Sequence, residues 1–286
     1  MRTANAMNKL FNPLVAIVVL LVSSVAHATL PIQTWRLANG ARVLFVENRA
    51  LPMLDVSVDF PAGYSRDEPA RAGLAGMTLG LMQQGAGGLD ETEIASRLAD
   101  VGANLGTRFD ADRAGYQVRT LSSPREREQA LDMFSRILQR PEFPEAVLAR
   151  EKTQLAASLQ ESDSKPSTIA DRAFQKAVFG THPYAIRGSG EVATTAGLTV
   201  TDLRAFHARW FRTDWAIVAI MGDVSRDEAD AIAQRLTANL PRADGPVPPL
   251  PAVVKLAAPL ELNIEHPASQ SHILMGQPGM KRSDPD

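Results

Sequence analysis

The chain has 286 residues, 45% of them hydrophobic, and so can build a sizeable core in one large or two moderate domains. Its 30 basic and 32 acidic residues give a formal net charge of -2, which provides no electrostatic reason to expect nucleic acid or an anionic membrane surface as partner. The sequence contains no cysteine, which excludes disulfides and thiolate metal sites.

The first 28 residues have the organisation of a secretory signal. Arg2 and Lys9 precede an apolar run from Pro13 to Val22, and Ala26-His27-Ala28 follows the run. A basic start, a short apolar core and an Ala-x-Ala site are typical of a cleaved signal peptide. The run is shorter than the ~20 residues that span a bilayer. We therefore expect cleavage near Ala28, no transmembrane segment afterwards, and a periplasmic or secreted mature chain.

Strand patterns are spread over the rest of the chain. Asn39-Gly40 between two short apolar runs predicts a β-hairpin. The alternation over 53–60 predicts a half-buried strand that continues this hairpin as an antiparallel meander. Segments 104–107 and 114–121 read as two further strands joined by a polar turn. The continuous apolar run over 215–221 predicts a buried central strand.

An apolar, glycine-punctuated segment over 73–85 predicts a helix. Ala72, Gly76 and Gly80 recur at every fourth residue, which places three very small residues on one helical face. Glycine inside a helix costs roughly 1 kcal/mol relative to alanine. We therefore expect another part of the protein to approach the backbone closely on this face.

Caps and periodicity predict the other helices. Asp90 and Glu93 have the spacing of a capping box, and Ser123 and Ser225 are each predicted to cap the helical pattern that follows them. The predicted helices cover 90–101, 124–139, 144–161, 168–179, 201–211 and 226–240.

The composition changes after residue 240. Residues 241–259 are rich in proline among small residues, which is typical of a semi-rigid linker. Segments 260–265 and 271–275 then have the pattern of two strands. Because two strands cannot close a core, we expect residues 260–286 to be the beginning of a truncated second domain.

Over about Thr34 to Leu240, these segments resemble the M16 family of zinc peptidases, which includes insulinase, pitrilysin and the mitochondrial processing peptidase. The resemblance lies in the order and spacing of short motifs, which are 37–43, 63–68, 72–75, 102–104 with Thr107, Glu151, 179–184, 206–211 and 222–224. It implies an α+β, roll-like fold in which an antiparallel sheet is covered by helices. Residues 29–240 would form the first domain, 241–259 the linker, and 260–286 the start of a second, similar domain.

Active members of this family bind zinc through His-x-x-Glu-His on a helix. The resemblance places Gly76, Leu79 and Gly80 at these positions. It also places Ser158 at the third ligand, seven residues after the retained acidic residue Glu151. Glycine and leucine side chains have no donor atom and serine is a poor neutral ligand, so a zinc site of the family type cannot assemble. We expect no metal and no catalytic residue in this chain, and another side chain or backbone segment in the space over Gly76 and Gly80.

No other catalytic pattern replaces this one. The histidines outside the predicted signal, His182, His207, His266 and His272, include no pair at i, i+3 or i, i+4. Gly188-Ser189-Gly190 lacks the spacing of a serine nucleophile motif and predicts a turn.

The family binds substrate as an extended strand at a sheet edge beside the metal helix. The resemblance assigns this edge to Ala103, Asn104, Leu105, Gly106 and Thr107. From the residues alone, the segment could equally be an internal strand or one that the missing domain covers.

The resemblance therefore implies a non-catalytic M16 subunit that binds or presents peptides and pairs with a zinc-bearing M16 peptidase, with zinc only in that partner. Two alternatives stay open. One is a weakly active metallopeptidase completed by a partner, to which Glu151 would contribute. The other is a metal-free peptide-binding or assembly scaffold without a peptidase partner.

Overall fold

The structure is a computed structural model that describes residues 31–267 and 269–280. The predicted signal over 1–28 lies outside these residues. The chain divides into two units, Met1–Gln33 and Thr34–Asp286; β1 starts at their boundary, and every later element belongs to the second unit.

The strands are β1 (Gln33–Arg36), β2 (Arg42–Glu47), β3 (Met53–Phe60), β4 (Gly85–Ala86), β5 (Leu89–Asp90), β6 (Asn104–Phe109), β7 (Ala114–Leu121) and β8 (Ile217–Gly222). The helices are α2 (Leu74–Met82), α3 (Glu91–Ala99), α4 (Pro124–Gln139), α5 (Glu145–Asp163), α6 (Pro166–Phe179), α7 (Val192–Ala196), α8 (Val200–Trp210) and α9 (Arg226–Thr237).

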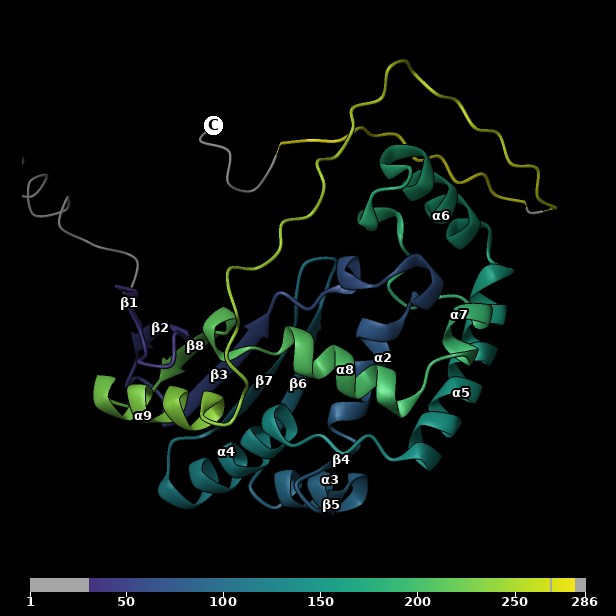
Figure 1. Cartoon of the computed structure of the whole chain (residues 1–286). Helices are drawn as coiled ribbons and strands as arrows, with labels where there is room; N and C mark the ends of the chain where they lie inside the picture. The colour runs from purple at the N-terminus through teal and green to yellow at the C-terminus, as the bar shows by residue number, and fades with distance from the viewer. Residues whose placement is uncertain (1–30, 268, 281–286) are drawn as a thin grey trace, which may run out of the picture. The chain divides into compact units, whose positions relative to one another are not determined.

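Six strands form one mixed sheet in the order β1-β2-β8-β3-β7-β6 (Figure 1). The predicted Asn39-Gly40 hairpin is confirmed, since β1 and β2 are neighbours in the sheet. The predicted meander is wrong, because β8 lies between β2 and β3. It runs parallel to β2, with Val43 opposite Val218, and antiparallel to β3, with Val56 opposite Ile220. Strand β7 pairs antiparallel with both β3 and β6. The fold is therefore α+β with a mostly antiparallel sheet, as predicted.

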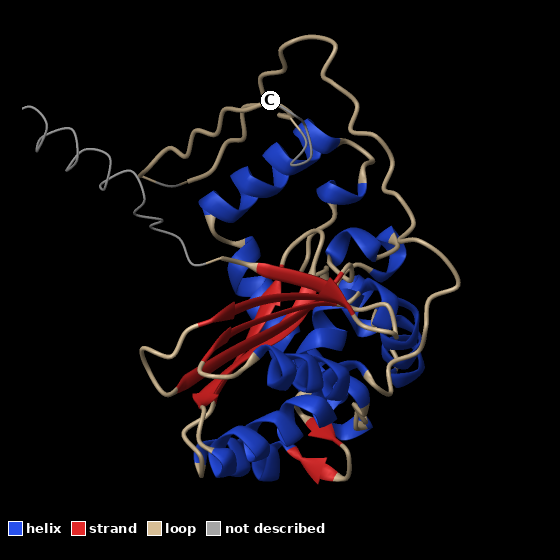
Figure 2. Cartoon of the chain, turned by 90° about the vertical axis from the view of Figure 1, so that its left-hand side faces the viewer, coloured by secondary structure: helices blue, strands red, loops and turns tan. Residues whose placement is uncertain are grey.

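The core lies on one face of this sheet. The side chains of Leu54, Val56 and Val58 on β3 are at most 1% exposed and join one core cluster with residues of α2, α4, α8 and α9. These helices and the sheet form adjacent layers (Figure 2). The run at β8 is central in the sheet, but the prediction of full burial is wrong, because Ile217 and Met221 remain 39% and 43% exposed. Strand β8 therefore buries one face only.

Most predicted helices are confirmed within one or two residues at their starts. The capping box of α3 is present, with Glu93 N–H donating to Asp90 Oδ1 at 2.8 Å and Asp90 N–H donating to Glu93 Oε2 at 3.0 Å. Ser225 caps α9 in the same way. The predicted cap at Ser123 is wrong: the residue precedes α4, but its hydroxyl donates to the Glu126 carboxylate and accepts from no backbone N–H. Helix α7 and the small β4–β5 pair were not predicted.

Residues 241–267 and 269–280 contain no helix or strand. The strands predicted over 260–265 and 271–275 are therefore wrong for this structure. A strand needs a hydrogen-bonded partner, and no described segment pairs with either one. Part of the proline-rich stretch is held through its carbonyl groups, since Trp215 Nε1 donates to Gly245 O at 2.9 Å and Arg66 Nη1 donates to Pro248 O at 2.8 Å. In the described part of the chain, no helix combines the length and apolar character needed to cross a membrane.

Candidate functional site

Helix α2 begins two residues later than the predicted stripe of small residues, which includes Ala72, requires. Gly73 precedes the helix in a left-handed conformation with φ at 95°, so Ala72 lies outside it. The prediction of three small residues on one helical face is therefore wrong for Ala72. Gly76 and Gly80 keep the expected spacing on α2.

A buried carboxylate fixes the start of α2. Asp67 accepts hydrogen bonds from the backbone N–H groups of Gly73 and Ala75, both at 2.9 Å. Free N–H groups at a helix N-terminus favour a negative charge. Burial nevertheless dominates and raises the pKa of Asp67 to about 7, with the bonds from the backbone of Ala75, Gly73 and Leu74 opposing the rise. Asp67 is thus a cap whose charge depends on pH near neutrality.

A cavity of about 590 Å³ lies over Gly76 and Gly80. Its walls come from α2, from α5, from the end of β6 and from the turn at Gly188-Ser189. Its lining residues are Tyr64, Gly73, Gly76, Met77, Gly80, Leu81, Phe109, Glu151, Gln154, Leu155, Ser158, Gly188 and Ser189.

The structure brings together four of the five degenerate or retained positions predicted from the sequence. Gly76 and Gly80 on α2 face the same cavity as Glu151 and Ser158 on α5. Leu79 does not line it: its side chain is 3% exposed within the core, and its carbonyl accepts a hydrogen bond from the Tyr116 hydroxyl.

The residues present do not fit a zinc ion. Zinc in proteins takes histidine nitrogen, cysteine sulfur or carboxylate oxygen ligands. Glu151 is the one carboxylate that lines the cavity, and Arg150 Nη2 lies 3.3 Å from its Oε1. Nowhere in residues 31–267 and 269–280 do three His, Cys, Asp or Glu side chains gather as a metal site would require. No step of a zinc mechanism can therefore be assigned to these side chains.

The space over the two glycines is filled unequally. A Cβ at residue 76 would stand 3.2 Å from the Gly188 carbonyl oxygen and 3.4 Å from the Phe109 ring. Among the described residues, and apart from the adjoining backbone of α2 itself, a Cβ at residue 80 would have no neighbouring atom within 4 Å. Phe109 and the Gly188 carbonyl approach Gly76, but Gly76 still lines the cavity. The expectation that other groups fill the vacated space is therefore met only in part over Gly76 and is wrong over Gly80.

Strand β6 is the last strand of the sheet and, among the described residues, pairs only with β7. Of the predicted peptide-binding residues, Asn104, Leu105, Gly106 and Thr107 lie in β6, and Ala103 immediately precedes it. The alternative of an internal strand is thus wrong for this structure. Contact of these residues with a peptide remains a prediction.

A second hollow, of about 610 Å³, adjoins the first along α5. Glu151 and Gln154 line both, while β6 contributes Leu105 to the second hollow and Phe109 to the first. We call these two hollows together the β6–α5 groove. Arg150 lines the second hollow and connects α5 to α3, because its guanidinium donates to Glu91 Oε1 at 2.8 Å.

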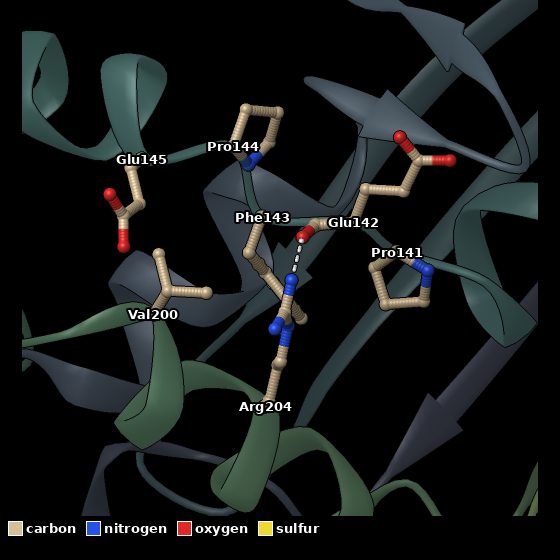
Figure 3. A pocket seen from close by; sticks show the side chains of 7 residues that line it. All are labelled: Pro141, Glu142, Phe143, Pro144, Glu145, Val200 and Arg204. Atoms are coloured by element: carbon tan, nitrogen blue, oxygen red, sulfur yellow. Dashed lines mark hydrogen bonds between the residues drawn. The ribbon is translucent and has the colours of Figure 1, made fainter.

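A third hollow, of about 620 Å³, lies between the segment 141–145 and α8 (Figure 3). Arg204 Nη2 donates to the Glu142 carbonyl at 3.1 Å, and Val200 of α8 also lines this hollow. It contains none of the residues predicted from the sequence and no nucleophile paired with a base. The β6–α5 groove is therefore the better candidate site.

Phe109 is the main site residue that the sequence reasoning missed. A signal was available, since residues two apart on a strand share a face and Phe109 follows Leu105 and Thr107 at that spacing. The turn at Gly188-Ser189 was predicted as a turn and is one, but its approach to Gly76 was not foreseen.

Comparison with known proteins identifies the family. Residues 42–188 match the family model described as insulinase (peptidase family M16). The chain belongs to the peptidase M16 family. Residues 197–286 of this M16 protein also match the model described as the peptidase M16 inactive domain.

Its relatives include proteins named as peptidases and one named as a non-peptidase. An uncharacterized zinc protease of Mycobacterium leprae is 25% identical over 257 residues, covering 89% of this chain and 56% of the relative. The non-peptidase homolog YmxG of Helicobacter pylori is 25% identical over 187 residues, covering 65% of this chain and 43% of the relative. This M16 protein thus spans about half the length of the curated relatives that it matches.

A solved structure supports the same conclusion. The crystal structure of a peptidase M16 inactive domain from Pseudomonas fluorescens has a TM-score of 0.76 and 36% identity, covering 79% of this chain and 54% of that one. With the inactive-domain match and the non-peptidase relative, it supports a non-catalytic M16-like protein.

Proposed function

We propose that this M16 protein is a non-catalytic subunit that binds or presents extended peptides along β6 and pairs with a zinc-bearing M16 peptidase. The observation that carries the proposal is a sheet edge with one described neighbour, beside a groove whose side chains do not fit zinc.

The free edge supports the peptide-binding part. A peptide that adds to an edge strand gains backbone hydrogen bonds, and pockets beside the edge receive its alternate side chains. Strand β6 is mostly exposed or half-buried, and the hollows at Leu105 and Phe109 lie at two points along it. An exposed edge must otherwise be protected against aggregation, which a bound peptide or a partner subunit would do.

The second part of the proposal, pairing with an M16 peptidase, assigns peptide hydrolysis to the partner subunit. Zinc and its ligands would belong to a subunit with an intact His-x-x-Glu-His, and this chain would enclose or present the peptide. The signal-like pattern over 1–28 supports export, so the pair would act in the periplasm or outside the cell.

Affinity purification of the full chain from its native host tests the pairing. We expect recovery of an exported M16 protein that carries His-x-x-Glu-His, together with chelator-sensitive peptide cleavage by the recovered complex. Recovery of non-peptidase proteins alone would favour the metal-free scaffold. Stoichiometric zinc and chelator-sensitive cleavage by this chain alone would contradict the proposal.

Replacing Glu151 by Gln in that complex distinguishes the proposed non-catalytic subunit from a weakly active metallopeptidase that a partner completes. Glu151 faces the cavity, but no described residue beside it can complete a metal site. We expect the turnover number of the complex to stay within about two-fold of the wild type, whereas loss of turnover with unchanged assembly would favour the partner-completed enzyme.

A further inference from the structure

The cavity over Gly76 and Gly80 is mainly apolar. Side chains of Met77 and Leu81 from α2, Phe109 from β6 and Leu155 from α5 contribute to its lining. Its volume of about 590 Å³ lies within the range of pockets that bind small ligands, which are mostly apolar with a few polar groups.

The floor of the cavity at Gly80 is bare backbone. No atom of another described segment lies within 4 Å of the position that a Cβ would take there. The opposite wall carries Ser158, an exposed residue of α5 with a small side chain. The cavity therefore has room for a side chain supplied by another molecule.

The charges around the cavity favour an apolar side chain. Glu151 is the one acidic group in the lining, and Arg150 lies beside it at 3.3 Å. An acidic side chain would lose its hydration and face Glu151, while a basic side chain would meet a carboxylate that already has an arginine partner.

Phe109 connects the cavity to β6, because it belongs to that strand and lines the cavity. A peptide paired along β6 projects every second side chain to the same side, so one of them can enter the cavity. We infer that the position occupied by zinc in active relatives is, in this chain, a pocket for one large apolar side chain of an extended peptide. This inference rests on the proposed peptide-binding function.

Binding of defined peptides tests the pocket. The probes are four fluorescein-labelled nine-residue peptides of Ser, Thr and Ala that differ only in a central Phe, Leu, Lys or Asp, titrated with the full chain by fluorescence anisotropy. Burial of one large apolar side chain predicts that the Phe and Leu peptides bind about 10-fold or more tightly than the Asp peptide.

Two variants test whether the cavity is the cause of the preference for Phe and Leu peptides. Gly80→Leu fills the space from α2, and Ser158→Leu narrows it from α5. We expect each to reduce the preference for Phe over Asp to less than about three-fold. Gly80→Ala is the matched control, because its single methyl group leaves most of the cavity open, and it should keep the preference. Leucine and alanine are better helix formers than glycine, so neither change at residue 80 should unfold the chain.

The outcomes separate the pocket from the proposed function. Equal binding of all four peptides, or an unchanged preference in both Gly80→Leu and Ser158→Leu, would overturn the pocket and leave peptide binding in place. Absence of binding by every peptide would contradict both.

Discussion

The carbonyl oxygen of Gly188 lies 3.2 Å from the point where a Cβ of residue 76 would stand. One turn further along α2, no other segment of residues 31–267 and 269–280 has an atom within 4 Å of the same point at Gly80. The two glycines therefore share a helix face but have different reasons to lack a side chain. Gly76 permits a close approach of the turn at 188–189, whereas Gly80 keeps a cavity open.

This difference predicts opposite effects of the same substitution. Gly80→Ala should raise the free energy of unfolding by about 0.5–1 kcal/mol, because alanine is the better helix former and the methyl group meets nothing. Gly76→Ala should gain less or be destabilising, because its methyl group would push against Gly188. Urea unfolding of the pair measures both. An equal gain at the two positions would show that Gly188 does not restrict residue 76.

Asp67→Asn should change how stability depends on pH. Burial raises the pKa of Asp67 to about 7 in the folded chain, against 3.8 as its ordinary value. The stabilisation from proton binding is therefore fully present below about pH 4 and is lost as the pH rises through 7. The unfolding free energy of the wild type, relative to that of Asp67→Asn, should fall by roughly 2–3 kcal/mol from pH 5 to pH 8.

Chemical denaturation of both proteins at several pH values gives this difference directly. Other titrating groups contribute to both curves and cancel in the subtraction. A difference that stays constant between pH 5 and pH 8 would mean that Asp67 keeps an ordinary pKa, with the N–H groups of Gly73 and Ala75 outweighing its burial.

Tyr116 and Tyr184 each donate a hydroxyl hydrogen bond, but they differ in burial. Tyr116 is fully buried and donates to the carbonyl of Leu79, while Tyr184 is less buried and donates to Asp112 Oδ1 at 2.7 Å. Tyr116→Phe leaves a buried carbonyl without this donor, so we expect a loss of about 1–2 kcal/mol in unfolding free energy. Tyr184→Phe should cost less than about 0.5 kcal/mol, because water can replace the hydroxyl. Thermal and urea unfolding of the two variants compare these costs, and a larger loss for Tyr184→Phe would contradict the assignment.

Local signals predicted much of the fold. The Asn39-Gly40 hairpin and the capping box of Asp90 and Glu93 depend on residues close together in sequence, and both are present. The position of β8 could not be predicted in the same way. Its apolar run fits any interior strand, and only pairing with β2 and β3, far away in sequence, places it between them.

Only the part of the candidate site that lies within one helix could be predicted from the sequence. Gly76 and Gly80 stand out by their spacing within one helix. Phe109 and Gly188 come from distant segments, and only tertiary packing brings them over α2. The segment 260–265 was predicted wrongly, because its strand-like pattern forms no strand where no described partner pairs with it.

Removal of divalent metal should leave the Tm of the full chain unchanged. The cavity holds Glu151 but no histidine, and Gly76, Gly80 and Ser158 offer no strong zinc ligand. A ligand that binds only the folded state, and is present at a free concentration of 100 times its dissociation constant, adds about 2.7 kcal/mol to the free energy of unfolding.

Zinc is such a ligand in an M16 peptidase with an intact His-x-x-Glu-His. That peptidase should therefore lose several degrees in Tm on treatment with a chelator. The Tm of this chain should shift by less than about 1 °C, since its described residues hold no comparable zinc site to empty. Parallel thermal scans and metal analysis of the two proteins measure this difference, and one zinc per chain with a chelator-dependent Tm would contradict the degenerate site.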